Sequence, residues 1–308
     1  MKMKKVFETP YINQLLALVL LCIALSLLSE RFLTFSNFLN IFKQSSVLAI
    51  LAIGMTFVIL TGGIDLSVGS ILALGGVVTA SLLAGGHNIV LAMVVGLLIG
   101  LVFGLTNGLF VSFFDLPPFI VTLATMAIAR GVTLVYTSGY PISTLPETFN
   151  YLGMGKIAGF PFIILLTLIT FVLFYFLLTK TSFGKYTYAI GDNKNAAILS
   201  GINVNLVLIL VYSICGLLSG FSGILLTSRL GSAQPTAGFG YELDAIACVV
   251  LGGTNLFGGK GSLIGTMIGV LIIGVITNGL NILGVSSFIQ QIIKGVILLL
   301  AILFSKRK

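Results

Sequence analysis

The chain has 308 residues, of which 57% are hydrophobic and only 8% are charged, against roughly 25% charged in soluble domains. This composition excludes an ordinary soluble domain and is typical of a polytopic membrane protein. The net charge of +8 fits the excess of Lys and Arg that cytoplasmic loops carry. No basic patch with interleaved aromatic residues lies outside the apolar runs, so no nucleic-acid partner is expected.

The first apolar run follows Lys2, Lys4 and Lys5 and looks at first like a secretory signal. It is too long for one, and no small-x-small cleavage site follows it, so we expect a retained first span. Because about 20 apolar residues cross a bilayer, we predict an all-α protein of about ten spans, in one transmembrane domain over residues 1–308. The predicted spans are 11–29, 47–61, 71–85, 89–110, 119–137, 162–179, 206–228, 244–257, 262–281 and 287–304.

The basic residues test this topology, because they concentrate in cytoplasmic loops. With ten spans and a cytoplasmic start, both termini and ten of the sixteen Lys and Arg residues lie inside. Arg130 and Lys294 then fall within spans. The basic residues left outside are Arg31, Lys43, Lys156 and Arg229. The distribution therefore supports a multi-pass protein with both termini in the cytoplasm.

A polar interruption, GGIDLSVGS, starts at Gly62. The predicted spans on either side have only about 15 residues each, so we expect the connection to dip into the bilayer. Non-helical backbone at that depth must be buried in protein or line a wet cavity. Gly62 and Gly63 permit the turn, and Asp65 or Ser67 is expected to cap the helix that begins near Val68. The alternative is a direct part of Asp65 in a translocation pathway.

Arg130 stands about eleven residues into a predicted span, which places it about 17 Å deep at 1.5 Å per residue. A charge at this depth is costly and usually faces the interior of the bundle. The position predicts either an ion pair that joins two helices or a residue that lines a pathway. Asn107 and Asn278, each inside an apolar run, are the other candidates for such an intramembrane pair or pathway.

A weak internal repeat relates the two halves of the chain. Residues 54–61 (GMTFVILT) resemble residues 220–227 (GFSGILLT), an offset of 166. Residues 105–109 (LTNGL) resemble residues 276–280 (ITNGL), an offset of 171. Each match pairs a span with the one five places later, so the paired spans cross in opposite directions. This indicates an inverted-topology repeat, which is typical of transporters with a pathway between the related halves.

The polar segment 180–205 is the only sizeable cytoplasmic loop in this topology. Asp192 or Asn193 can cap a short helix that runs through Leu199, and Gly201 can end it. The small apolar surface that such a helix would present outside the membrane consists of Ala196, Ala197, Leu199 and Ile202. Exposed apolar patches of this kind often bind a partner; a helix lying on the membrane surface is the alternative.

An enzyme is not indicated. The chain has three cysteines without CxxC spacing and a single histidine, His87, so neither a disulfide nor a metal site is predicted, and no catalytic triad can be assembled. The stretch GTNLFGGKGS, from Gly253, fails the GxxxxGK[ST] spacing of a phosphate-binding loop at Thr254 and at Gly261. We therefore expect that the chain does not itself hydrolyse ATP.

The segment 180–205 is similar to the coupling loop of binding-protein-dependent ABC importers, whose permeases carry an EAA motif followed by glycine. Asn195, Ala196, Ala197 and then Gly201 stand there in this chain, so an asparagine replaces the glutamate. The chain as a whole, from about Phe32 to Lys306, resembles the ribose-type permeases of bacterial carbohydrate importers. The stretches that carry the resemblance are TGGIDLSVGS, RGVTLVYT from Arg130, YAIG from Tyr188, SGINV from Ser200, and SAQPTAGFGYELDAIA from Ser232.

The resemblance implies a permease for a monosaccharide, ribose or a related sugar, in a bacterial plasma (inner) membrane. It implies a homodimer, a separate ATPase subunit that binds the ATP, and an extracytoplasmic sugar-binding protein, with no cofactor in this chain. The residues it assigns to ATPase coupling are Asp192, Asn193, Asn195, Ala196, Ala197, Leu199 and Gly201.

Two alternatives stay open. One is a related permease for another small solute, such as branched-chain amino acids, although AQPTAG followed by Tyr241-Glu-Leu-Asp244 favours the sugar branch. The other is a gradient-driven secondary transporter, for which only Asp65 and Asp115 could form the ion site.

Overall fold

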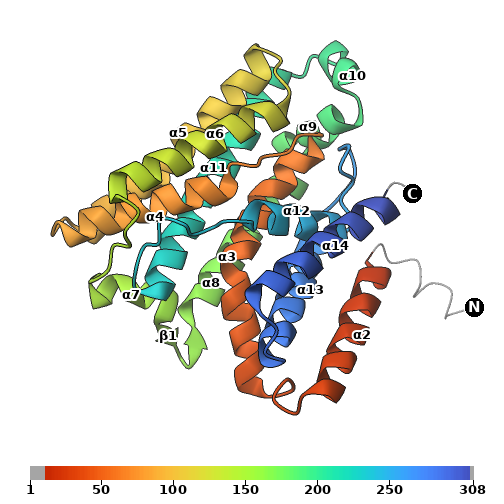
Figure 1. Cartoon of the computed structure of the whole chain (residues 1–308). Helices are drawn as coiled ribbons and strands as arrows, with labels where there is room; N and C mark the ends of the chain where they lie inside the picture. Colours follow the sequence, from red (N-terminus) through yellow and green to blue (C-terminus); the bar gives the residue numbers. More distant parts are fainter. Residues whose placement is uncertain (1–10, 306–308) are drawn as a thin grey trace, which may run out of the picture.

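The computed structural model describes residues 11–305, which form a bundle of helices (Figure 1). Six helices are long and apolar enough to cross a membrane: α3 (Phe35–Leu60), α5 (Ile89–Phe113), α6 (Pro118–Thr137), α8 (Phe162–Lys180), α11 (Val204–Leu230) and α13 (Leu263–Ile282). Shorter helices complete the bundle: α2 (Ile12–Leu28), α4 (Val68–Ala84), α7 (Glu147–Met154), α9 (Ser182–Asp192), α10 (Lys194–Leu199), α12 (Tyr241–Leu251) and α14 (Ser287–Ser305).

Each predicted span contains a helix, but two boundaries are corrected. The predicted span 47–61 belongs to α3, which begins much earlier, at Phe35. The predicted span 244–257 contains only α12, whose 11 residues extend about 17 Å at 1.5 Å per residue. A helix of that length cannot by itself cross a hydrocarbon core of about 30 Å. In a ten-span topology the non-helical segment 231–240 before it must supply the rest of the crossing. The basic residues at either end of the chain that entered the topology argument, residues 2–5 and 306–308, lie outside the described residues.

Within the part of the chain that the structure describes, one small hairpin and an isolated bridge between Ile142 and Ala233 interrupt the helical structure. Strands β1 (Lys156–Ile157) and β2 (Phe160–Pro161) pair antiparallel between α7 and α8. Each has two residues, so the hairpin is a connection and adds no sheet to the core.

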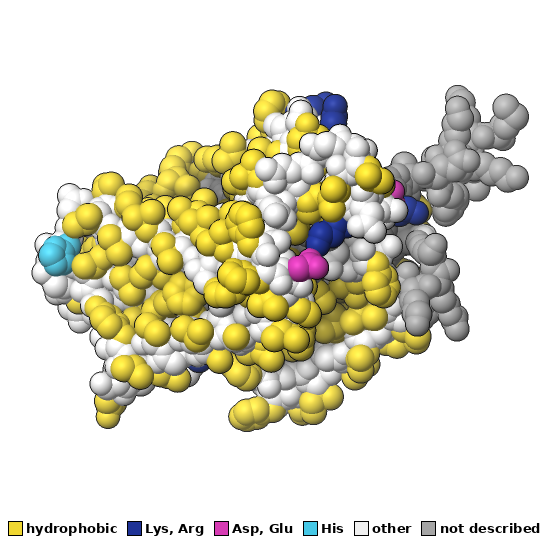
Figure 2. Space-filling view, turned by 90° about the horizontal axis from the view of Figure 1, so that it is seen from above, with side chains coloured by type: hydrophobic (Ala, Val, Ile, Leu, Met, Phe, Trp, Pro, Cys, Tyr) yellow, Lys and Arg dark blue, Asp and Glu magenta, His cyan; other side chains and the backbone are white. Residues whose placement is uncertain are grey.

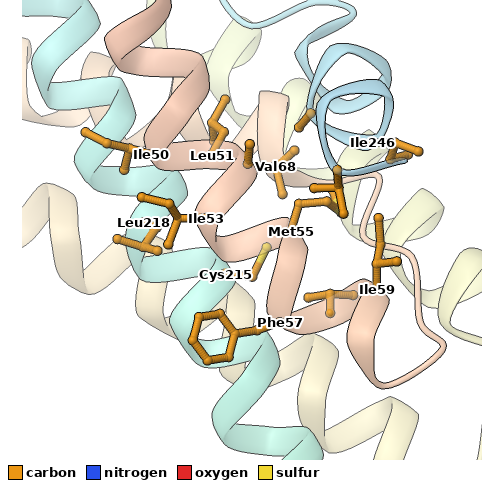
Figure 3. Close-up of a cluster of buried hydrophobic side chains, with 14 of the residues drawn as sticks. Ile50, Leu51, Ile53, Met55, Phe57, Ile59, Val68, Cys215, Leu218 and Ile246 are labelled. Carbon is orange, nitrogen blue, oxygen red and sulfur yellow. The ribbon is translucent and has the colours of Figure 1, made fainter. Parts of the chain in front are cut away.

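Helix α3 is the centre of the bundle. Every residue from Ser45 to Leu60 is buried, and a helix that is apolar on all sides belongs in a core. Helices α8, α11, α12 and α13 pack around it. Figure 3 shows Ile53 and Phe57 of α3 in the buried cluster that also contains Cys215 of α11 and Ile246 of α12.

Helices α5 and α11 pack with their backbones in contact, because glycines face each other along the seam. A Cβ atom added at Gly100 would collide with the carbonyl oxygen of Gly216, and one added at Gly216 would collide with that of Gly100. A Cβ at Gly104 would collide with the carbonyl oxygen of Tyr212. Small residues allow this close approach, which is how helices associate where apolar surface gives no advantage over lipid.

The short helices α4 and α12 begin beside each other near the centre of the bundle and run away from it in different directions (Figure 1). The backbones of Gly69, in the first turn of α4, and Gly238, just before α12, are in contact. Each helix is reached through a non-helical segment, residues 61–67 and residues 231–240 respectively. The fold therefore places two helix starts, and the two segments that lead to them, at its centre.

The outer face of the bundle is apolar. Helix α8, for example, exposes Leu168, Ile169, Val172, Leu173 and Phe176. Figure 2 shows hydrophobic side chains across the visible surface with few charged groups among them. An exposed apolar surface of this extent, together with six helices of spanning length, defines a polytopic membrane protein.

Gly100→Ala tests the seam between α5 and α11. We expect it to destabilise the protein by about 1–3 kcal/mol, because the new methyl group must push apart two backbones. The control is Gly131→Ala on α6, where a new Cβ would have no atom within 4 Å. That change should leave stability unaltered or raise it, since Ala favours a helix over Gly by about 0.5–1 kcal/mol. Thermal unfolding of the purified variants measures both effects, and equal shifts would contradict the backbone contact.

Candidate functional site

The connection between α3 and α4, residues 61–67, buries the side chains of Asp65 and Ser67, while Gly62 is exposed. Gly62 takes a φ of +80°, a conformation that glycine adopts without strain. Gly63 is required for a different reason, because a Cβ there would collide with the hydroxyl group of Tyr212. Asp65 and Ser67 are both 0% exposed. The expected turn inside the fold is therefore present, with its polar side chains buried in protein.

The helix start at Val68 is confirmed, but the predicted cap is wrong. Ser67 makes no side-chain hydrogen bond to the start of α4. Its hydroxyl group instead donates to Oδ1 of Asp65 over 2.5 Å. The same carboxylate oxygen accepts the backbone N–H of Ser67 over 2.8 Å. Asp65 thus shapes the turn before the helix and does not bond to the first N–H groups of α4.

Asn107 of α5 joins this cluster. Its amide nitrogen donates to the Ser67 hydroxyl over 2.9 Å, so a chain of hydrogen bonds runs from Asn107 through Ser67 to Asp65. The hydroxyl group of Tyr212, on α11, lies against Gly63 of the same turn. The cluster ties the non-helical segment to both helices of the glycine seam.

Arg130 of α6 holds the other non-helical segment. Its Nη1 donates to the carbonyl oxygens of Pro235 at 2.6 Å and Ala237 at 2.9 Å, and its Nη2 donates to that of Gly69 at 3.5 Å. The guanidinium is half-buried and forms no ion pair within 4 Å among the described residues. The predicted inward orientation is thus present, but carbonyl groups take the place of the acidic partner. Arg130 joins the start of α4 to the segment before α12.

Lys294 is a second cation inside the bundle, and the sequence did not predict its partner. Lys294 of α14 contacts Oδ2 of Asp244, in the first turn of α12, at 2.6 Å. Asp244 is buried and Lys294 is largely so. The signal in the sequence is the presence of two isolated opposite charges in apolar segments, which can lie inside a membrane protein only if they find partners.

The three intramembrane candidates do not meet one another. Asn107 bonds to Ser67, and Arg130 bonds to carbonyl groups, as described above. Asn278 of α13 exchanges two amide hydrogen bonds, of 3.0 and 2.9 Å, with Asn37 of α3. Each of the three therefore fastens a different pair of elements in the bundle.

The predicted coupling segment forms two helices, α9 and α10. Asn193, and not Asp192, caps α10, because its side chain accepts the N–H of Ala196 over 3.0 Å. Gly201 follows α10 with a φ of +80°, as expected for a glycine that ends a helix. Asn195, Ala196 and Leu199 are exposed, Leu199 by 88%.

Ala197 was expected on the outward-facing surface of this helix, but it faces inward. It is only 3% exposed and belongs to the hydrophobic core, because α10 turns this side toward the rest of the protein. Ile202 is also partly buried against that core. The exposed apolar surface of α10 therefore consists of Ala196, Ile198 and Leu199.

Backbone contacts connect this segment to the turn between α3 and α4. The N–H of Gly259 donates to the carbonyl oxygen of Leu60 over 3.0 Å. A Cβ at Gly191 would collide with the same carbonyl oxygen. A Cβ at Gly258 would lie 2.8 Å from the nitrogen of Gly62. We call these five residues the glycine junction; it joins the end of α9, the start of the 61–67 turn and the loop after α12.

An exposed ion pair also anchors α10. Lys194 contacts Oδ1 of Asp115, in the loop between α5 and α6, at 2.7 Å. The hydrogen bond and the charge of the Lys194 ammonium group hold the pKa of the Asp115 carboxyl group below its ordinary value. Because both groups are well exposed, the pair positions α10 more than it stabilises the fold.

Six helices of spanning length, an apolar exterior, short helices that begin inside the bundle, and polar groups gathered at those helix starts define a membrane transport protein. Comparisons with known proteins support this class. Residues 37–302 match the family described as "Branched-chain amino acid transport system / permease component". The chain belongs to this family.

Several curated relatives are similar over nearly the whole chain. The ribose import permease protein of Bacillus subtilis (strain 168) is 53% identical over 295 residues, which cover 95% of this chain and 92% of the relative. The ribose import permease protein of Escherichia coli (strain K12) is 50% identical, over 96% of this chain and 94% of the relative. The D-allose transport system permease protein of the same strain is 42% identical, over 90% and 85%. No solved structure matches the chain significantly.

This protein is accordingly a permease component of an ABC importer, a transport protein and not an enzyme. The family and the transport class were both predicted from the sequence, and both are confirmed.

Arg130→Ala tests the contact between α6 and the segment before α12. We expect a loss of about 2 kcal/mol or more, because the half-buried carbonyl groups of Pro235 and Ala237 lose a charged donor. Arg130→Lys should recover little, since an ammonium group lacks the planar fork that reaches several carbonyls at once. The matched control is Lys156→Ala on the exposed hairpin, which should change little. Folded yield and thermal unfolding are the measurements, and a parental result for Arg130→Ala would contradict this account.

Proposed function

We propose that this chain is the membrane-spanning permease of an ATP-driven importer whose cargo is ribose or a related monosaccharide. The observation that supports this cargo is the 53%, 50% and 48% identity, over at least 94% of the chain, to proteins named ribose import permeases. Relatives named for D-allose and L-arabinose point to the same chemical class at lower identity. A branched-chain amino acid as cargo has the support of the family description alone.

The proposed assembly has further components. An ATPase subunit binds and hydrolyses ATP in the cytoplasm, and an extracytoplasmic binding protein delivers the sugar. A second copy of this chain completes a pathway at or near the axis between the two copies. The chain itself acts as a single transmembrane domain without a cofactor, and both of its termini lie in the cytoplasm. Two observations support this assembly: the similar relatives are named as import permeases, and α10 exposes an apolar surface.

We further propose that α3–α6 and α11–α14 are inverted repeats, which accounts for the packing. Helix α5 packs on α11 as α13 packs on α3, and α6 packs on α4 as α14 packs on α12. Arg130 and Lys294, 164 positions apart, occupy matching helices. Each reaches the first turn of the short helix in its own half, at Gly69 and Asp244 respectively. The correspondence of packing and of charge supports the repeat more strongly than the two short sequence matches do.

In this proposal, ATP-driven movement enters the permease at α10. The glycine junction carries it to the turn before α4 and to the loop after α12. Contacts between backbones transmit a displacement better than long side chains, which can change rotamer and absorb it. Both short helices are thereby coupled to one cytoplasmic surface.

Reconstitution into liposomes tests the assignment of energy coupling. The purified chain alone should neither hydrolyse ATP nor accumulate ribose, and accumulation should require the ATPase subunit, the binding protein and ATP together. Omitting each component in turn provides the controls. Accumulation driven by a sodium or proton gradient without ATP would contradict the proposal.

Variants of α10 test the docking surface. We expect Ala196→Arg and Leu199→Glu to leave folding intact, because both positions are exposed, and to reduce co-purification of the ATPase and sugar uptake by about tenfold or more. A charge buried in a fitted interface without a partner costs several kcal/mol. Asn195→Glu, which restores the residue of the EAA motif, should be tolerated. Ala197→Glu is the contrasting variant: it should lower the folded yield, because this position is buried. Full ATPase binding by both exposed variants would place the docking surface elsewhere.

A further inference from the structure

Asp65 is a buried carboxyl group without a cationic partner. It is 0% exposed. The salt bridges among the described residues are Lys194–Asp115 and Lys294–Asp244, and neither includes Asp65. An ionised carboxylate enclosed in this way, in a protein that itself lies in a membrane, is very costly unless something neutralises it. The geometry around the carboxyl group indicates what does.

The two oxygens of Asp65 differ sharply in their surroundings. Oδ1 accepts two hydrogen bonds, from the N–H and from the hydroxyl group of Ser67. Oδ2 is buried and has no partner among the described residues. Oδ1 of Asn107 is likewise buried and has no described partner. The Asn107 amide is held beside Asp65, because both side chains bond to the hydroxyl group of Ser67.

These two orphaned atoms are both acceptors if Asp65 is ionised, so neither can satisfy the other. Turning the Asn107 amide over would place its oxygen against the Ser67 hydroxyl group, whose single hydrogen is already donated to Oδ1 of Asp65. One hydrogen between the two oxygens would satisfy both atoms and would remove the buried charge. The hydroxyl group of Tyr212 is also buried without a described partner and lies against Gly63, but a hydrogen bond from it would leave the charge of Asp65 in place.

We propose that Asp65 is a buried proton-binding site. The proton sits on Oδ2 and is donated to Oδ1 of Asn107, so that Asp65 is a neutral carboxylic acid while its Oδ1 continues to accept from Ser67. The result is a closed ring of hydrogen bonds through Asp65, Ser67 and Asn107 that needs no counter-ion. It fixes the turn before α4 to α5 at the centre of the bundle. This inference goes beyond the proposed transport function and does not depend on it.

A neutral acid and an ionised one respond differently to replacement by asparagine. Asp65→Asn reproduces the proposed hydrogen-bonding pattern, with a carbonyl oxygen toward Ser67 and an N–H toward Asn107. We expect the purified full-length variant to keep its folded yield and to unfold within about 2 °C of the parent.

Asp244→Asn is the matched control, because it is the same substitution at another buried aspartate. Asp244 is paired with Lys294, so the amide would leave a buried ammonium group without its counter-charge. We expect the unfolding midpoint of this variant to fall by about 5 °C or more. Opposite outcomes for one chemical change would separate a neutral aspartic acid from an ion-paired one.

Infrared spectroscopy can detect directly whether the carboxyl group of Asp65 is protonated. The chain has only eight Asp and Glu residues, so the difference spectrum of the parent minus Asp65→Asn at neutral pH should contain one carboxylic-acid C=O band. That band should shift when the protein is transferred to heavy water. Subtraction of the variant cancels any contribution from the half-buried Glu242.

Three results would overturn the proposal. The first is a difference spectrum without the acid band. The second is damage to Asp65→Asn as severe as that to Asp244→Asn. The third is a parental unfolding midpoint that rises in sodium chloride but not in choline chloride, with the rise abolished in Asp65→Asn, because a bound metal cation would then neutralise Asp65 in place of the proton.

Discussion

The backbone contact between α5 and α11 fixes the positions of the functional residues at the centre of the bundle. Side chains usually hold helix axes 8–10 Å apart, and the opposed glycines at positions 100 and 216 remove them from this seam. Asn107 of α5 and Tyr212 of α11 are thereby brought to the same turn, at Ser67 and Gly63. In a membrane the hydrophobic effect does not draw helices together, so close packing of this kind must supply much of the attraction. A larger residue in the seam would separate the groups that shape the turn.

The charged groups inside the bundle follow one rule: each is satisfied locally, and each at the start of a short helix. Arg130 bonds to three carbonyl groups, whereas Lys294 pairs with a carboxylate. Non-helical backbone at membrane depth carries free polar groups that must be bonded within the protein. Arg130 does this for the segment before α12 and for the first turn of α4, whereas Lys294 neutralises a carboxylate in the first turn of α12. Their role in holding two breaks in the helical structure explains why an apolar chain retains them.

The sequence predicted much of this architecture because membrane helices have strong compositional signals. Apolar runs located a helix for every span, and the lone arginine at position 130 was correctly placed inside the bundle. The sequence could not identify the hydrogen-bond partners of Arg130, because they are backbone carbonyl groups. Every residue has one, so the carbonyl group of Pro235 leaves no signal in the sequence. It also placed the end of the α12 span too late, at residue 257, although Gly252 and Gly253 follow Leu251 directly. The direction of Ala197 was misjudged because a helix of six residues has too few positions to define a face.

The two short helices are held by two different kinds of contact, and this difference determines what can move. At the centre, α4 and α12 are held by directional contacts: Arg130 with the carbonyl of Gly69, and Lys294 with Asp244. At the cytoplasmic end of the proposed topology, the glycine junction holds the adjoining segments by direct backbone contact. Long cationic side chains can follow a helix through a small displacement while keeping their bonds, whereas opposed backbones cannot slide without separating. Movement at the junction would therefore be passed on rigidly, and the flexible contacts at the centre would accommodate it.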